Sequence, residues 1–212
     1  MKYVGMPHGM WLLFKRSFEH CLSSVLGFEK DEATRITKAA KSKYKEVIDS
    51  LPEFEKGDRF KMNIVNCAML ASFYMNMEKK PKIEQMTRYY REAMMTGVMK
   101  LFCNNSGKRT FKDKYIAGMK KTASFKAADR NRYSWNMEFR PYSDGSGYEA
   151  RFDRCGICTL MRELGIPELV PAMCALDYTM TEAGGSAAFV REYTLASGGP
   201  YCDCGYKKKV RV

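Results

Sequence analysis

The sequence predicts an α+β fold, with a helical N-terminal portion, residues 1–128, and then a small antiparallel sheet carrying two inserted short helices, residues 129–212. Two observations lead to this prediction. Apolar residues recur every three or four positions through the first portion, which is typical of helices that pack through one face. From Tyr133 the spacing changes to two, which is typical of half-buried strands. A chain of 212 residues lies close to the usual size of one domain, so we expect a single domain, residues 1–212.

Apolar stripes predict the helices of the first portion. Glycine and proline fall between these stripes, where helix ends are expected, and Asn104–Gly107 has the composition of a loop. The stripes run from Trp11 to Val25, Ile36 to Leu51, Phe60 to Tyr74, Ile83 to Leu101 and Phe111 to Met119.

Strands and short helices are expected to alternate in the second portion. Two alternating segments flank the turn Ser143–Gly147, which predicts a β-hairpin. Either Pro167 or Pro171 suits the first turn of a helix that ends near Met180. The other elements expected are strands Tyr133–Phe139 and Tyr148–Phe152, a helix Cys158–Leu164, and strands Phe189–Ala196 and Tyr201–Tyr206, the last two joined by Ser197–Pro200.

Composition limits the classes of function. The net charge of +12 favours anionic partners, such as small carboxylates or phosphates. The basic stretch Lys108–Arg132 and the tail Lys207–Arg211 are expected to be solvated surfaces rather than a nucleic-acid site, because no recognised binding motif accompanies them. No apolar run is long enough for a membrane span or a signal peptide, so we expect a cytoplasmic protein. Both a monomer and a homo-oligomer remain open.

Eight cysteines and only two histidines make thiols the candidate reactive groups. Five cysteines lie in the last third of the chain, and a reducing compartment favours free thiols, metal ligands or nucleophiles over disulfides. Three interpretations stay open: a reactive thiol at Cys155, Cys158 or Cys202 near a helix start, a zinc or iron-sulfur site, or small buried residues that gather by chance. The ligands of the metal site, for zinc or another divalent metal, would be Cys155, Cys158, Cys202 and Cys204.

Charged and aromatic residues of the same segment could complete a site. Asp177 follows Cys174 by three residues, so on a helix the two share a face, with Glu168 at or just before that helix. Arg191 could bind a substrate carboxylate through two parallel hydrogen bonds, or pair at the surface with Glu192 or Glu149. Trp135 could be a core residue or a wall for a flat ring.

Three motifs follow one another in the last third of the chain: RCGICTLMRELGIPEL from Arg154, MCALDY from Met173, and REYTLASGGPYCD from Arg191 to Asp203. With these motifs in this order, the segment resembles the L-2-amino-thiazoline-4-carboxylic acid hydrolase family. Cys204 departs from the family pattern, where an aromatic residue is expected.

The resemblance implies an activity and a set of roles. The activity is hydrolytic opening of a 2-amino-thiazoline ring to N-carbamoyl-cysteine, or cleavage of a carbon–nitrogen or carbon–sulfur bond in a related heterocycle. Such chemistry needs an activated nucleophile, a proton donor and a clamp for the ring carboxylate. Cys155 or Cys202 would be the nucleophile, Asp177 or Asp203 the acid/base, and Arg191 the clamp, with a metal-bound hydroxide as an alternative nucleophile. A cysteine-rich metal or redox module without turnover is the competing function, and a basic nucleic-acid-binding protein is less favoured.

Overall fold

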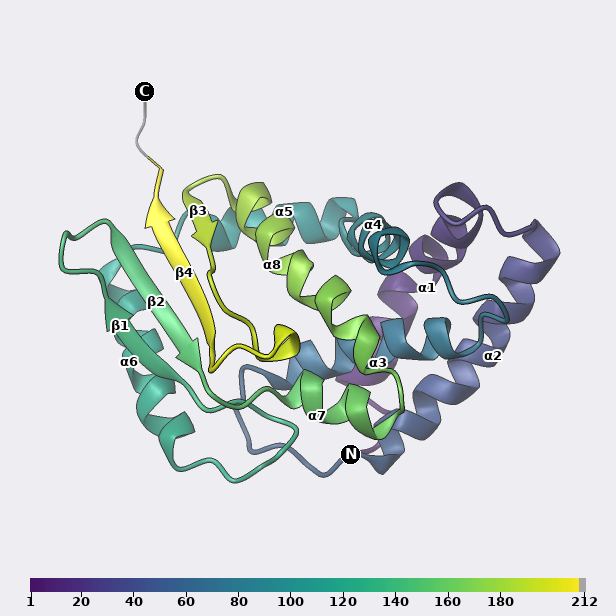
Figure 1. Ribbon diagram of the computed structural model, residues 1–212, viewed down its shortest axis with the longest axis horizontal. Helices are drawn as coiled ribbons and strands as arrows, with labels where there is room; N and C mark the ends of the chain where they lie inside the picture. Colours follow the sequence, from purple (N-terminus) through teal and green to yellow (C-terminus); the bar gives the residue numbers. More distant parts are fainter. Residues whose placement is uncertain (210–212) are drawn as a thin grey trace.

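Residues 1–209 are described by this computed structural model, and they form eight α-helices and one four-stranded antiparallel sheet (Figure 1). The α+β prediction is confirmed, with six helices preceding the sheet and two inserted between β2 and β3. The helices are α1 (Met6–Ser24), α2 (Lys30–Ser50), α3 (Lys61–Met75), α4 (Ile83–Met94), α5 (Gly97–Gly107), α6 (Asp113–Ala127), α7 (Gly156–Glu163) and α8 (Val170–Gly184). The strands are β1 (Glu138–Pro141), β2 (Gly147–Phe152), β3 (Ala187–Val190) and β4 (Cys202–Lys208).

The helix α3 lies at the centre of the helical half. It is buried on nearly every side, which explains why its sequence is apolar without a clear stripe. Trp11 of α1 stacks between Tyr44 of α2 and Phe73 of α3, with ring centroids 5.8 and 5.7 Å away. Burial of each such side chain contributes about 1.5–3 kcal/mol, so this aromatic group fixes α1 and α2 against α3.

Two details of the helical prediction are wrong. The stripe Ile83–Leu101 is two helices, because the side chain of Thr96 accepts a hydrogen bond from the backbone N–H of Met99 and so starts α5 after a break. Asn104–Gly107 is the last turn of α5 rather than a loop. Gly107 is required there because a Cβ atom at this position would overlap the backbone of Gly184 in α8.

The sheet has the strand order β1-β2-β4-β3, and every neighbouring pair is antiparallel. In the register of β2 with β4, Cys202 lies opposite Phe152 and Cys204 lies opposite Ala150. Side chains alternate along a strand, so these four point to the same face of the sheet. Asp203, between the two cysteines, points to the other face.

Two predicted strands differ from the structure. The predicted hairpin is present, but β1 begins at Glu138 and residues 133–137 form an irregular segment. Phe189–Ala196 is also not one strand, because β3 ends at Val190 and Leu195–Ser197 is a turn of 3₁₀ helix. The proline-containing start of α8 is correctly placed: Pro167 begins a short 3₁₀ turn and Pro171 lies in the first turn of the α-helix.

A buried charge cluster explains why the segment before β1 is not a strand. The ammonium group of Lys126, at the end of α6, donates hydrogen bonds to Asp58, to Asp129 and to the hydroxyl of Ser134. The Lys126 side chain is fully buried, against the expectation of a solvated basic stretch. Ser134 in turn donates to Asp58 at 2.8 Å, so the segment bends inward to complete the cluster.

This cluster also positions the start of α7. The backbone of Tyr133 and Ser134 packs so closely on Gly156 that a Cβ atom there would overlap the Tyr133 carbonyl.

Burial opposes ionisation of Asp129, but the contact with Lys126 holds the pKa of its carboxyl below the ordinary value. This contribution to stability is therefore complete above a pH of about 3.9 and is lost as the pH falls below it.

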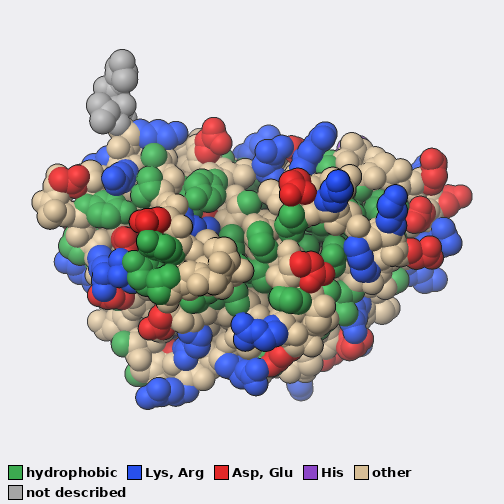
Figure 2. Space-filling view, in the orientation of Figure 1, with side chains coloured by type: hydrophobic (Ala, Val, Ile, Leu, Met, Phe, Trp, Pro, Cys, Tyr) green, Lys and Arg blue, Asp and Glu red, His purple; other side chains and the backbone are tan. Residues whose placement is uncertain are grey.

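No helix within residues 1–209 is both long and apolar enough to cross a bilayer. On the face shown in Figure 2, Lys and Arg side chains are interspersed with Asp, Glu and apolar side chains. Arg211, the last residue of the predicted basic tail, lies outside the described residues.

Replacing Lys126 with methionine should destabilise the fold by about 3–5 kcal/mol. Within residues 1–209, the buried Asp58 would then have no ion-pair partner, and Asp129 would keep only the longer contact with Arg154, at 4.0 Å. Urea unfolding followed by circular dichroism measures this change. Lys121→Met, at an exposed position of the same helix, is the matched control and should change stability by less than about 0.5 kcal/mol. Equal effects of the two substitutions would contradict the assigned role of the cluster.

Candidate active site

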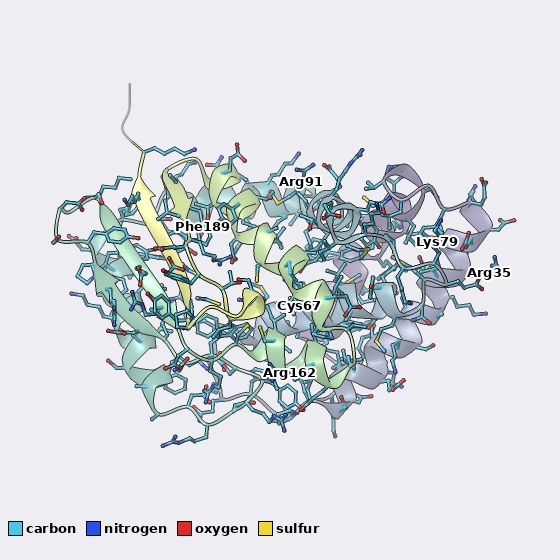
Figure 3. All side chains as sticks on the ribbon, in the orientation of Figure 1. Arg35, Cys67, Lys79, Arg91, Arg162 and Phe189 are labelled. Carbon is cyan, nitrogen blue, oxygen red and sulfur yellow. The ribbon has the colours of Figure 1, made fainter. Side chains whose placement is uncertain are left out.

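A cavity of about 440 Å³ lies between the sheet and the helices. Its walls come from α1, α3, α5, α6, α8, the start of α7 and the inner face of β2 and β4. In Figure 3, sulfur atoms gather near the labelled Cys67, where α7, α8 and the start of β4 approach one another. The predicted site residues that line the cavity are Trp135, Cys155, Cys174, Asp177, Arg191, Cys202 and Cys204.

Cys155 occupies the N-cap position of α7, with extended backbone, and its thiol is buried. Its neutral thiol makes no capping hydrogen bond. The thiolate, in contrast, would receive hydrogen bonds from the thiol of Cys158, the backbone N–H groups of Cys158 and Ile157, and the indole of Trp135. These donors outweigh the cost of burial and lower the pKa of the Cys155 thiol to about 7. The positive end of the α7 dipole acts in the same direction.

Cys158 is the partner of Cys155 rather than a second reactive thiol. It stands three residues later on the first turn of α7, where an N-cap side chain and the third helical residue meet. Its hydrogen bond to Cys155, together with burial, raises the pKa of the Cys158 thiol. The pair therefore loses its first proton at a pH below the ordinary cysteine pKa and its second proton at a pH above it.

An ion pair between Arg191 and Asp177 lies in the cavity wall, where α8 faces β4. Arg191 follows the last residue of β3, and its Nη2 donates to Oδ2 of Asp177 at 2.5 Å and to Sγ of Cys204 at 2.9 Å. Its Nη1 donates to the carbonyl of Cys174 at 3.1 Å, and its Nε is buried without a partner. The surface pair with Glu192 or Glu149 is not formed. Because the terminal nitrogens are occupied, the guanidinium is better placed to orient Asp177 than to bind a substrate.

Asp177 faces the cavity from the middle of α8. The side chain is 44% accessible, and this accessible surface borders internal space rather than the outer surface. Burial raises the pKa of the Asp177 carboxyl, while Arg191 opposes that rise. Asp177 is therefore the cavity residue best suited to give and take a proton. Burial also raises the pKa of Cys174 to about 12, so that thiol stays neutral.

The segment between β3 and β4 covers Cys202. Thr194 caps the short 3₁₀ turn, and Asp203 accepts hydrogen bonds from the backbone N–H groups of Glu192 and Tyr193 at 2.8 and 2.6 Å. These contacts direct the N–H of Leu195 toward Sγ of Cys202 at 3.2 Å. Burial still raises the pKa of the Cys202 thiol, so Cys155 is the more acidic of the two candidate nucleophiles.

Three predicted site residues lie outside the cavity lining. Cys158 is behind Cys155, and Asp203 is on the outer face of the sheet, where its carboxylate holds the backbone. Glu168 is exposed and accepts a hydrogen bond from the hydroxyl of Tyr74 at 3.1 Å. Of the predicted carboxylates, only Asp177 borders the reacting space.

The four-thiolate metal site, one of the three interpretations that the sequence left open, is not assembled. Within residues 1–209, no three His, Cys, Asp or Glu side chains are grouped so that they could hold a metal ion. The four-thiolate arrangement of Cys155, Cys158, Cys202 and Cys204 is therefore absent from this structure, although two of its pairs are close in the sequence. All eight cysteines are free thiols.

Several residues of the cavity were not predicted from the sequence. Cys67 of α3 is hydrogen-bonded to Tyr90 of α4, and both are buried in the wall. Asn66 carries a buried side-chain oxygen without a partner in the described structure. Arg59 precedes α3 and bonds the sulfur of Met119 and the hydroxyl of Thr122, at 3.2 and 3.4 Å. Asn66 could have been identified from the sequence as a polar residue within an otherwise apolar helix. No feature of the sequence distinguished Arg59 as a cavity residue.

Most of the residues that line the cavity lie within a region matched by a protein-family model. A family model for L-2-amino-thiazoline-4-carboxylic acid hydrolase matches residues 60–206, more than two thirds of the chain. The chain belongs to this family. No curated protein and no solved structure matches it. The region matched to the hydrolase family runs from the cavity residue Phe60 to the cavity residue Tyr206, so it contains every part of the cavity wall except Arg59 and the residues supplied by α1.

Alkylation by iodoacetamide should detect one thiol whose reactivity rises with pH to half of its maximum near pH 7, because the thiolate is the reactive form. Mass spectrometry should locate the label on Cys155. Cys158→Ala removes a hydrogen bond to the thiolate, so it should move the midpoint upward, whereas Cys21→Ala, far from the cavity lining, should not. A midpoint at the ordinary value of about 8.5 would refute an activated Cys155.

Proposed function

We propose that this protein is a hydrolase that opens a 2-amino-thiazoline ring, or a closely related small heterocycle, with Cys155 as the nucleophile. The observation that carries the proposal is the placement of an acidified thiol at the start of α7, in the same cavity as a carboxyl with a raised pKa. Membership in the hydrolase family supports this class of reaction. The two groups match what ring opening requires, which is a nucleophile and a proton donor.

The chemistry follows from the reacting carbon. In a 2-amino-thiazoline this carbon is bonded to the ring sulfur and to two nitrogens, so it is amidine-like and electrophilic. The Cys155 thiolate would form a bond to it while the bond to the ring sulfur breaks, and the departing sulfur would take a proton from Asp177. Water would then add to the same carbon, passing a proton to Asp177, and the bond to Cys155 would break. The product carries a carbamoyl group on nitrogen and a free thiol.

The surrounding residues support these steps. The N–H groups at the start of α7 stabilise the thiolate when it is free and when it leaves. Arg191 holds one oxygen of Asp177 in place, which makes it a positioning residue in this scheme. Trp135 lies against Phe60, with ring centroids 5.2 Å apart, and offers a flat wall to a ring.

The competing function is a redox module without turnover, and the Cys155–Cys158 pair is the observation in its favour. An acidic thiol hydrogen-bonded to a less acidic one, at a helix start with two residues between them, suits reversible disulfide formation. Rapid, reversible oxidation of this pair, combined with no hydrolysis of any thiazoline, would favour that alternative.

Cys155→Ala should reduce kcat for thiazoline opening by at least about a thousandfold, because the nucleophile is lost. Asp177→Asn should reduce kcat by about 10²–10⁴-fold, the usual contribution of a general acid–base group. Release of the substrate thiol measures both. Cys21→Ala, buried outside the cavity lining, controls for the loss of a cysteine as such. Retained activity in Cys155→Ala would exclude the nucleophilic mechanism.

Recognition of the substrate carboxylate can be assigned by comparing two arginines. Arg191 already has a carboxylate partner, whereas Arg59 borders the cavity and bonds only neutral groups within the described structure. Arg59→Gln should therefore reduce kcat/KM for the acid about ten- to hundredfold while sparing its methyl ester, in line with about 1.5–3 kcal/mol for a hydrogen bond to a charged group. Arg191→Lys should reduce kcat/KM equally for both. The reverse pattern would make Arg191 the carboxylate clamp.

A further inference from the structure

The cavity is larger than the substrate named by the family. At about 30 Å³ for each non-hydrogen atom, the space a water molecule takes in the liquid, 440 Å³ holds about fifteen such atoms. A 2-amino-thiazoline carboxylic acid has nine non-hydrogen atoms and would leave space for about six more even at this loose packing. Protein interiors pack more tightly than liquids, so this estimate of the spare space is low.

The walls of the cavity differ between the sheet side and the side of α1, α5 and α6. The thiols, Asp177 and Arg191 come from α7, α8 and the segments next to the sheet. The other helices contribute mainly apolar side chains, and methionine is frequent among them. Methionine is flexible and polarisable, so it adapts to apolar ligands of irregular shape. The methionines on that side are Met10, Met99 and Met119.

Exposed apolar side chains mark the mouth of the cavity. Leu13 of α1 is 46% exposed, and Val98 and Phe102 of α5 are 59% and 45% exposed, yet all three also line the cavity. Apolar side chains that are shared between the outer surface and a cavity form an apolar entrance. The α1 part of this entrance precedes the region matched to the hydrolase family, so that match does not account for it.

We infer that the natural substrate carries, besides the group that reacts at Cys155, an apolar extension of about six or more carbon atoms, which occupies the outer part of the cavity between α1, α5 and α6. This inference rests on the proposed function for the reacting group. The extension itself is recognised only by the size and apolar character of the outer walls.

S-alkylisothioureas, from S-methyl to S-octyl, are suitable probes. Their reacting carbon is bonded to one sulfur and two nitrogens, as in the thiazoline, and hydrolysis with one water gives an alkanethiol and urea. Binding to the Cys155→Ala protein, measured by calorimetry, should strengthen about two- to fourfold for each added methylene up to about six carbons. In the wild-type protein, kcat/KM for urea release should rise in parallel.

Two matched pairs of substitutions locate the bound chain. Leu13→Gln and Phe102→Gln should weaken binding of the S-octyl compound about fivefold or more while leaving the S-methyl compound unchanged. Their neighbours Leu12→Gln and Leu101→Gln, at positions 55% and 61% exposed that do not line the cavity, should change neither. All four positions are exposed, so the variants are expected to fold.

The outcomes separate the two proposals. Binding that strengthens with chain length, in a protein that releases no urea from any member, would support the apolar extension and count against the hydrolase mechanism. Urea release with equal kcat/KM for S-methyl and S-octyl compounds would support the mechanism and overturn the extension. Equal effects of the Leu12 and Leu13 substitutions on S-octyl binding would also overturn it.

Discussion

The buried contact of Lys126 with Asp58, Asp129 and Ser134 is the constraint on which the site depends. It joins the end of α6 and the nearby segment before β1 to the segment before α3, and Asp58 of that segment is 68 residues from Lys126 and 76 from Ser134. Because Ser134 is drawn into this cluster, the adjoining backbone packs on Gly156 and Trp135 faces the cavity. A charge cluster outside the cavity thus sets the position of the N-terminal turn of α7, and with it the thiol of Cys155.

Side chains alternate along β4, so neighbouring residues of the segment Cys202–Cys204 face opposite sides of the sheet. Cys202 and Cys204 point into the cavity, whereas Asp203 points outward and holds the backbone of the segment that follows β3. That segment then places the N–H of Leu195 against the sulfur of Cys202. This short segment therefore contains a residue that shapes the loop beside residues that face the cavity.

The cavity combines a few polar groups with extensive apolar walls, and each depends on the other. Water-poor surroundings raise the pKa of the Asp177 carboxyl and strengthen its interaction with Arg191. The same surroundings would raise the pKa of Cys155 as well, were it not for the donors at the start of α7. The ordinary pKa values of a carboxyl and a thiol are far apart, but here the pKa of Asp177 is raised and that of Cys155 is lowered. Both groups are thereby brought closer to the pH range in which acid–base and nucleophilic steps operate. The large apolar volume next to them leaves space for more than a compact heterocycle.

The sequence by itself determined the α+β class, most helices, the hairpin and the concentration of candidate thiols, because these follow from local periodicity and from which residues share a helix or strand face. It also placed Cys155 near the start of a helix, although the predicted helix began at Cys158 and α7 begins at Gly156. Only the tertiary structure decided that Asp177 pairs with Arg191, that Glu168 and Asp203 lie outside the cavity, and that Cys67, Asn66 and Arg59 line it. It also decided that residues 133–137 leave the strand pattern to meet Lys126. These outcomes depend on contacts between residues distant in the sequence, where the energetic demands of buried charge outweigh local propensity.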